Sequence, residues 1–406
     1  MRKLANLFLI LFLIAAGLGL GSALLSPHWP DNPLAGLHNL ANLLLVLLAV
    51  PIYFGFGFNR HLPKLIFVPL LAWLCWGLLD YWPLEALIGG KYRLYAACGQ
   101  LLLGWLALQL VRRQNRKSLL LVRSQFAGPG FSGGNFFRFC LLSIPLLPLA
   151  TLLLSYAAAS TLIEQNTAGF VRLKPNGLYM TEKVYARGVK EIRLAGMIHL
   201  GQQEYYQELA ASFDAGDSLL LAEGVSDAQG LLSGRFSYGN LAELLGLASQ
   251  EQFNFIGRVI EAEQLDQPGS SEPGRLDILR ADIDLQQFDP RTIEVLNAIG
   301  THLLGSRSLR DGYRNFSRWA EQHVTPELNR VVMEDLLEKR NRSLLSYLPI
   351  GLQHYRTLII PWGALHMPGI EAAIRQQGFE FQRSRERLSI DFLLLPYERL
   401  FENLAN

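Results

Sequence analysis

Five apolar stretches fill the first 161 residues of the chain, and each approaches the roughly 20 residues that an α-helix needs to cross about 30 Å of hydrocarbon. They cover residues 4–25, 38–58, 65–83, 93–111 and 139–161. This pattern predicts an α-helical membrane region with five spans. The first stretch exceeds the roughly 7–15 apolar residues of a signal peptide, so we expect an uncleaved anchor.

Residues 162–406 have a different pattern, in which short apolar runs alternate with segments of helical periodicity. Two strand–helix–strand units are expected, one over residues 190–201, 202–215 and 218–223 and the other over residues 357–362, 368–377 and 379–382. A further long helix is expected over residues 326–346. The sequence therefore predicts that an α/β domain, long enough to bury its own core, follows the membrane region.

Charge separates the same two regions. Residues 1–161 contain 12 basic and only three acidic residues, whereas residues 162–406 contain 25 basic and 32 acidic ones. With 50% hydrophobic and 18% charged residues, the chain is unlike a disordered protein or a simple cytosolic enzyme. The acidic domain offers no basic stripe for a phosphate backbone, so nucleic acid is not an expected partner. All three cysteines lie in or beside the apolar stretches, which excludes disulfides and thiolate metal sites from residues 162–406.

Basic residues also predict the orientation in the membrane. Two precede the first span, two lie between the second and third spans, and six fill residues 112–138 before the fifth. The positive-inside rule places these segments in the cytoplasm. With an odd number of spans, residues 162–406 are then expected outside the cytoplasm, in a protein integral to the lipid bilayer of a bacterial inner or cell membrane.

A glycine–x–x–histidine sequence closes the first strand of each unit. Gly196 and His199 form it in the first unit, and Gly363 and His366 form it in the second. If both strands are parallel members of one sheet, their carboxyl ends share an edge, where open α/β sheets bind ligands. Glu223, which closes the strand at residues 218–223, reaches the same edge. We therefore expect His199, His366 and Glu223 to converge.

This set of side chains points to metal chemistry. Two neutral imidazoles and a carboxylate suit Zn, Mn, Co or Fe and leave positions open for water and substrate. Such an ion lowers the pKa of bound water and polarises a carbonyl group, as hydrolysis requires. Glu223 is either a ligand or the base that activates water. The alternative is that each histidine caps its strand or forms a hydrogen bond within the core.

The same residues resemble the motifs of the TraB/GumN family, which includes the Tiki membrane-anchored proteases and the pheromone-shutdown proteins. The similarity covers most of residues 178–398 and none of the expected spans. It comprises AGMIHLG with Gly196 and His199, LLLAEG with Glu223, LLEKRNRSLL with Arg340 and Asn341, and GALHMPG with Gly363, His366 and Gly369. A hydrophobic residue commonly follows the family's glutamate, whereas Gly224 follows Glu223 here.

The resemblance implies a mixed sheet with helices and, for Tiki-like members, a divalent-metal-dependent peptidase. On that basis we expect Mn, Co or Zn bound by His199, His366 and Glu223. Arg340 and Asn341 are expected to position a peptide or protein substrate or to stabilise developing charge. Considered by itself, Arg340 is simply a solvated charge on the helix.

Three other carboxylates are candidates. Asp282 and Asp284 lie on one side of an extended segment, where they supply a ligand, orient a metal-bound imidazole, or form a turn before Phe288. Glu204 is a general base or, more simply, an acidic residue in the first turn of a helix.

Three functions remain open at this point. The first is a membrane-anchored metal-dependent hydrolase that acts as a peptidase outside the cytoplasm. The second is a non-catalytic receptor that binds and sequesters peptides, as the pheromone-shutdown relatives suggest. In the third, the spans form a pore or a partner-binding module and the outer domain is regulatory.

Overall fold

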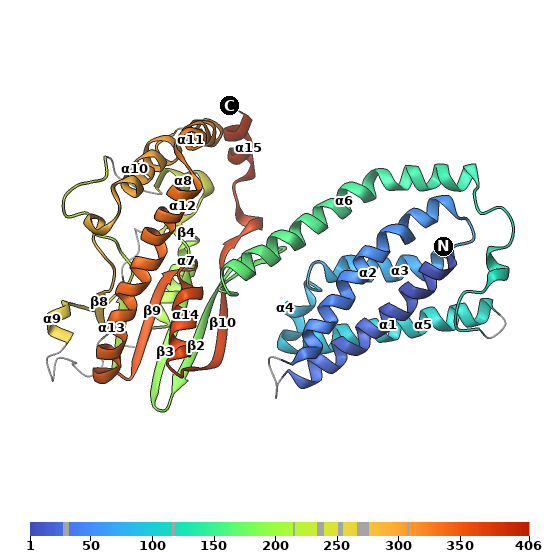
Figure 1. The fold of residues 1–406 in the computed structure, drawn as a ribbon, viewed down its shortest axis with the longest axis horizontal. Helices are drawn as coiled ribbons and strands as arrows, with labels where there is room; N and C mark the ends of the chain where they lie inside the picture. The colour runs from blue at the N-terminus through green and yellow to red at the C-terminus, as the bar shows by residue number, and fades with distance from the viewer. Residues whose placement is uncertain are drawn as a thin grey trace. The chain divides into compact units, whose positions relative to one another are not determined.

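The computed structural model describes residues 1–26, 32–115, 118–213, 216–233, 239–250, 255–265, 276–306 and 308–405. The chain divides into two compact units, Met1–Ala159 and Ser160–Asn406. The first is helical and the second contains a sheet, as the ribbons in Figure 1 show. The structure thus has an amino-terminal helical region with apolar helices and a carboxyl-terminal mixed α/β domain.

The helices of the first unit are α1 (Arg2–Leu25), α2 (Pro33–Phe58), α3 (Lys64–Gly77), α4 (Leu84–Ile88), α5 (Tyr92–Gln114) and α6 (Gly133–Asn166), with short 3₁₀ turns η1 (Gly89–Lys91) and η2 (Arg123–Phe126). Within the described residues, four helical segments are long and apolar enough to cross a membrane: α1, α2, the continuous stretch Leu84–Gln114, and α6.

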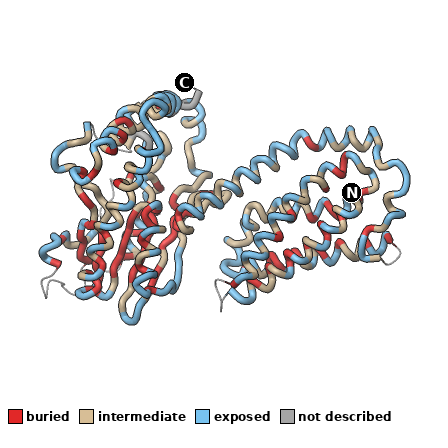
Figure 2. The backbone as a smooth tube through the Cα atoms, in the orientation of Figure 1, coloured by how far each residue is buried: buried red, intermediate tan, exposed pale blue. Residues whose placement is uncertain are grey.

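Helix α1 packs against both α2 and α5, and small residues allow the close approach. A Cβ atom added to Gly19 would lie 2.8 Å from His38 Cε1, and one added to Gly104 would lie 2.6 Å from Leu13 Cδ2. The ring of His38 also lies 2.8 Å from Ala15 O through its Nδ1. Many large apolar residues of these helices are exposed. Figure 2 colours long stretches of the helices pale blue for exposed residues. Such exposed apolar residues suit lipid contact.

The predicted count of five spans is wrong, because α3 is too short to be one. It ends at Gly77 after 14 residues, which correspond to about 21 Å of helix. The chain then turns, with positive φ angles at Asp80 (49°) and Tyr81 (58°). The apolar run at residues 65–83 therefore contains a helix and a turn. Because the number of candidate spans among the described residues is four and not five, an odd number of spans no longer supports the predicted orientation.

The second unit is built on an eight-stranded sheet in the order β1-β2-β3-β9-β5-β8-β7, with β10 also paired to β2. Its strands are β1 (Val171–Lys174), β2 (Gly177–Arg187), β3 (Lys190–Met197), β5 (Ser218–Ala222), β7 (Arg258–Ile260), β8 (Asp277–Arg280), β9 (Thr357–Gly363) and β10 (Glu380–Asp391). A separate two-stranded sheet joins β4 (Leu200–Gly201) to β6 (Ala248–Ser249).

The described helices of this unit follow in chain order. They are α7 (Gln203–Ala211), α8 (Gly239–Leu245), α9 (Ala262–Leu265), η4 (Leu285–Gln287), α10 (Pro290–Ala298), the π-helix η5 (Ile299–Leu304), α11 (Leu309–His323), α12 (Pro326–Met333), the π-helix η6 (Glu334–Lys339), α13 (Arg340–His354), α14 (Met367–Gln376), η7 (Phe392–Leu394) and α15 (Tyr397–Ala405).

The sheet is mixed because its two halves differ in direction. Strands β3, β9, β5, β8 and β7 are parallel neighbours, whereas β1, β2 and β10 pair antiparallel. Helices α13 and α14 pack with β9 and β3, and Leu219, Leu220 and Leu221 of β5 are all buried. A continuous apolar run of this kind is typical of a parallel strand that is covered on both faces.

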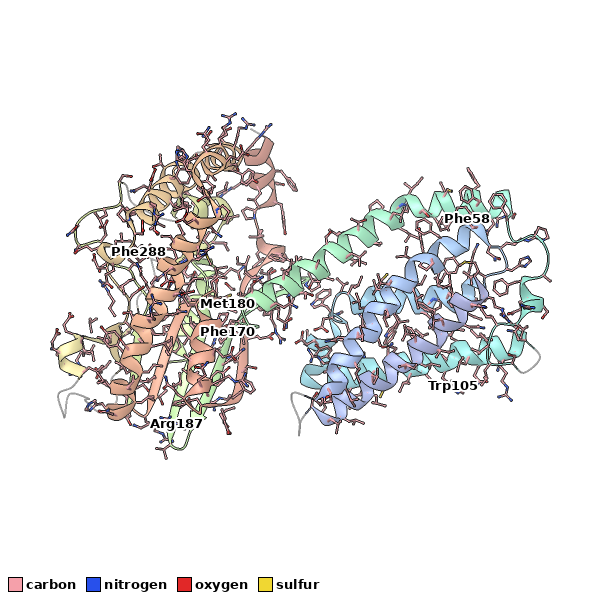
Figure 3. All side chains as sticks on the ribbon, in the orientation of Figure 1. Phe58, Trp105, Phe170, Met180, Arg187 and Phe288 are labelled. Atoms are coloured by element: carbon pink, nitrogen blue, oxygen red, sulfur yellow. The ribbon has the colours of Figure 1, made fainter. Side chains whose placement is uncertain are left out.

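Gly196 has a packing reason to be glycine. An added Cβ atom would lie 3.1 Å from Phe170 Cβ and 3.3 Å from Phe170 O. Phe170 and Met180, labelled in Figure 3, are both buried where β1 begins to pair with β2. The first glycine–x–x–histidine sequence therefore fits the end of β3 closely against this neighbouring backbone.

Two expected elements differ in detail. The strand expected over residues 190–201 is interrupted after Met197, and its last two residues form β4 in the smaller sheet. The helix expected over residues 326–346 is helical throughout, but a π turn (η6) interrupts the α-helical geometry and the segment continues to His354.

Candidate functional site

Four neighbouring parallel strands bring the candidate residues to one edge of the sheet. His199 follows β3, His366 follows β9, Glu223 follows β5 and Asp282 follows β8. Because β9 lies between β3 and β5, the two histidines and the glutamate come from three adjacent strands. The parallel pairing on which their convergence depends is therefore present.

Both carboxylate oxygens of Glu223 accept hydrogen bonds. Oε1 accepts from Arg340 Nη2 at 2.7 Å, and Oε2 accepts from the backbone N–H of Gly363 at 2.6 Å. The side chain is only 8% exposed. A Cβ atom at Gly363 would stand 3.5 Å from both Glu223 Oε2 and His366 Cδ2, which places Gly363 in van der Waals range of both side chains.

Arg340 joins Glu223 to a second carboxylate, Asp282. Its Nε donates to Asp282 Oδ1 at 3.0 Å and its Nη2 to Asp282 Oδ2 at 2.7 Å, a bidentate pair. The Asp282 side chain is fully buried. Burial by itself would lower the pKa of Arg340, but the hydrogen bonds and charges of Asp282 and Glu223 outweigh it and raise that pKa.

Gly224 contributes through its backbone. Its N–H donates to Asp282 Oδ2 at 2.9 Å, and its φ angle is 155°, a value that favours glycine. The departure from the family pattern at this position thus coincides with a tie between the end of β5 and the Asp282 carboxylate.

His366 is buried and held on two sides. Its Nδ1 lies 2.8 Å from Asn341 Oδ1, and its ring meets Trp362 edge to face, with ring centroids 5.1 Å apart. Burial lowers the pKa of His366 to about 4; the charges of Arg340 and His199 lower it further, while Glu223 and Asp282 oppose the shift. The imidazole is therefore neutral at pH 7.

The contact with Asn341 indicates which nitrogen of the neutral His366 ring carries the proton. Since Asn341 Nδ2 donates to the backbone oxygen of His366 at 3.4 Å, its Oδ1 faces the ring and accepts from Nδ1–H. Nε2 then carries a lone pair and lies 3.6 Å from Glu223 Oε1. A Cβ atom at Gly369 would lie 2.8 Å from Asn341 Nδ2, so glycine in the GALHMPG motif lets Asn341 approach α14.

Arg340 and Asn341 stand directly after the π turn η6. A π turn alters the direction in which the following side chains leave the helix, and such turns are frequent at functional sites. Here the two consecutive residues engage two different partners, Glu223 and His366. Arg340 also extends over the Trp362 ring, 5.5 Å from its centroid.

His199 differs from His366 in its surroundings, because it is exposed. Its backbone oxygen accepts a hydrogen bond from Gln250 N at 2.9 Å, and its charge is near enough to lower the pKa of His366. Within the described part of the chain, no group of three or more His, Cys, Asp or Glu side chains is arranged to hold a metal ion. The three-ligand shell of His199, His366 and Glu223 stays a prediction.

The Glu223 and His366 pair does fit one ion. Two ligands that are each about 2.1 Å from a tetrahedral ion are about 3.4 Å apart, close to the observed 3.6 Å. The remaining ring nitrogen of His366 is held by an amide oxygen, as is typical of metal-binding histidines.

The other candidate carboxylates have roles outside this cluster. Asp284 accepts hydrogen bonds from Ser226 Oγ, Ala228 N and Gln286 N, which makes it part of a turn. Glu204 is exposed in the first turn of α7. The pairing of Asp282 with Arg340 and the contact of Trp362 with His366 were not expected. The available signal was that Trp362 lies near the end of a buried strand and that Asp282 follows another.

Replacement of Asp282 by asparagine should destabilise the protein by about 3 kcal/mol, because the buried guanidinium of Arg340 loses a counter-charge. Urea unfolding of the full chain measures this loss. Asp284→Asn, two residues further on in the turn, is the matched control and should cost clearly less. Equal losses of stability in the two variants would show that the buried Arg340–Asp282 ion pair contributes no more to stability than the turn at Asp284.

The buried, neutral His366 should make stability fall in acid. Below pH 6.5 the unfolded chain takes up a proton that the folded chain refuses until its own pKa of about 4. Stability should therefore drop by about 3 kcal/mol between pH 6.5 and pH 4, at up to about 1.4 kcal/mol per pH unit. The test measures the unfolding free energy of wild type, His366→Gln and the exposed control His354→Gln across this pH range. Only His366→Gln should lack the loss of stability in acid. Parallel pH profiles for all three proteins would contradict the expectation.

Comparison with known proteins gives no match: no protein-family model, no curated protein and no solved structure matches the chain. The resemblance to the TraB/GumN family therefore rests on its four motifs.

Proposed function

We propose that the Ser160–Asn406 unit is a metal-dependent hydrolase of the TraB/GumN type that cleaves peptide bonds. The observation that carries this proposal is the pair formed by His366 Nε2 and Glu223 Oε1, 3.6 Å apart. With the ring neutral and its proton on Nδ1, both atoms are hydrogen-bond acceptors. Two acceptors that face each other are stabilised by a cation that both contact.

The charge of the cluster supports the same proposal. Glu223 and Asp282 supply two carboxylates, and Arg340 supplies one guanidinium. With the His366 imidazole neutral, Glu223, Asp282 and Arg340 together carry one surplus negative charge in a buried setting, which favours a bound cation and disfavours an anionic ligand. Mn, Co or Zn would be held by His366 and Glu223, with His199 as a third ligand from the exposed loop after β3.

The side chains divide the remaining tasks. A divalent ion at this position supplies a water of lowered pKa and polarises the scissile carbonyl group. The N–H groups of Arg340 donate to Asp282 and Glu223, so Arg340 positions the Glu223 carboxylate, whereas the resemblance implied that it positions substrate or stabilises developing charge. Asn341 orients the His366 ring. Glu223 either ligates the ion or takes the proton of the water.

A peptide-binding receptor without catalysis is the second candidate. The absence, among the described residues, of a preassembled three-ligand cluster favours it. The exposed Leu365, beside His366, offers an apolar contact that a bound peptide needs in either case.

Metal binding distinguishes the two functions. Titration of the full chain in detergent with Mn²⁺ or Zn²⁺ should give one ion per chain, because the acceptor pair and the surplus charge form one site. His366→Ala should abolish binding and His199→Ala should weaken it at least about tenfold, the usual scale for loss of a supporting group. His354→Ala, on the exposed end of α13, should bind as wild type does.

The receptor is the better description if wild type binds no ion and still retains peptides. Cleavage of an unstructured peptide library, followed by mass spectrometry, completes the test. The hydrolase should lose cleavage with a chelator and in Glu223→Gln.

The domain is proposed to lie outside the cytoplasm on the basis of the charge difference across α6 alone, because with the four described spans the basic residues before α1 and after α2 lie on the side opposite residues 112–138. Six basic residues occupy positions 112–138, at or before the start of α6, while its other end leads into the sheet domain. The positive-inside rule then places residues 112–138 in the cytoplasm and Ser160–Asn406 on the opposite side. Peptides or proteins near the outer surface of the bilayer would be the substrates.

Cysteine labelling tests this orientation. In a background without Cys75, Cys98 and Cys140, Ser384→Cys should react with a membrane-impermeant maleimide on intact cells, because Ser384 is exposed on β10. Ser124→Cys, exposed between α5 and α6, should react only after lysis. The reverse pattern would place the domain in the cytoplasm.

A further inference from the structure

A second buried polar cluster lies on β2, β3 and β10, apart from the candidate metal site. Glu182 is shared by two arginines: Arg193 Nε donates to its Oε1 at 2.8 Å, and Arg387 Nη1 lies 2.7 Å from its Oε2. The three side chains are 5%, 10% and 3% exposed, respectively. Two guanidinium groups thus share one carboxylate in a nearly dry environment.

One edge of the Arg387 guanidinium has no partner. Its Nε and Nη2 are buried and make no hydrogen bond, and the hydroxyl of Ser389, two residues further along β10, is also buried without one. Nε and Nη2 form the planar fork with which arginine binds an anion in bidentate fashion, as Arg340 binds Asp282. Within the part of the chain that the structure describes, no second carboxylate meets this fork.

Burial of the Arg387 Nε and Nη2 donors and of the Ser389 hydroxyl without hydrogen-bond partners is energetically costly. Each buried donor without a partner destabilises the folded chain, and a buried charge without compensation destabilises it more. A neutral ligand would satisfy the donors and leave the surplus positive charge. An anion accepts the hydrogen bonds and also compensates the surplus positive charge.

We propose that the Arg387 fork and the Ser389 hydroxyl bind a small inorganic anion of the chloride type. The surroundings are tight: a Cβ atom at Gly201 would lie 3.0 Å from Ser389 Oγ and 3.3 Å from Tyr205 Cδ1. This close packing favours a single small ion over a peptide carboxylate or a phosphate ester.

The anion would secure the segment that follows His199. Ser389 O accepts a hydrogen bond from Gln202 N at 2.8 Å, and Gly201 of β4 packs on the same residue. Binding at Arg387 and Ser389 therefore stabilises the contact between the β10 irregularity at residues 388–390 and the start of α7. The proposal stands without the metal site, because its residues are not part of that site.

Thermal melting of the full chain in detergent tests the anion site. The protein is compared in sodium chloride and in sodium gluconate at equal ionic strength. Chloride at a tenfold excess over its dissociation constant should raise Tm by about 3–5 °C. Ser389→Ala, which removes only the hydroxyl oxygen, should lose about half of this shift or more, and Arg387→Gln should lose all of it.

Arg385→Gln is the matched control, since Arg385 is exposed on the same strand, and it should keep the full shift. Crystals grown in bromide should show an anomalous peak between Arg387 and Ser389. The proposal is overturned if wild type melts at the same temperature in both salts, if Ser389→Ala keeps the whole shift, or if no bromide peak appears there.

Discussion

The ion pair network of Arg340 with Asp282 and Glu223 holds the candidate site together. It joins the ends of β8 and β5 to the start of α13, three segments that are distant in the sequence. Because Asp282 is fully buried and Arg340 nearly so, neither charge is stable without the other. The position of Glu223 beside His366 depends on this network.

The same network sets the electrostatics of the site. Arg340 compensates only one of the two carboxylates, and burial keeps His366 neutral. The result is a negative cluster with an imidazole lone pair directed toward a carboxylate oxygen. Its neighbour on the opposite side of β3, the cluster of Arg193, Glu182 and Arg387, has the opposite surplus. The proposed cation site and the proposed anion site therefore differ in the sign of their surplus charge.

Much of the fold could be predicted because the signals are local. The runs at 218–222 and 357–363 are largely apolar, and the run at 190–197 ends in apolar residues. The repeated glycine–x–x–histidine sequence marked two strand ends that prove to be parallel neighbours. The membrane region was predicted as apolar helices for the same reason. Its third expected span, residues 65–83, was not correct, because the turn at Asp80 and Tyr81 depends on backbone angles that hydropathy does not report.

The site could be predicted only in part, because its pairings are long-range. Nothing in the sequence near Asp282 indicates that Arg340 is its partner, 58 residues away, and nothing indicates the π turn that separates α12 from α13. The reason for glycine at 369 also emerges only when Asn341 is in place. Residue types were informative, whereas their roles required the packed structure.

A diffraction experiment on the full chain soaked with Mn²⁺ tests the central claim most directly. An anomalous peak within about 2.3 Å of both His366 Nε2 and Glu223, with His199 turned toward it, is the result that a hydrolytic metal site predicts. A map in which the two side chains keep their positions and no ion binds between them would contradict it.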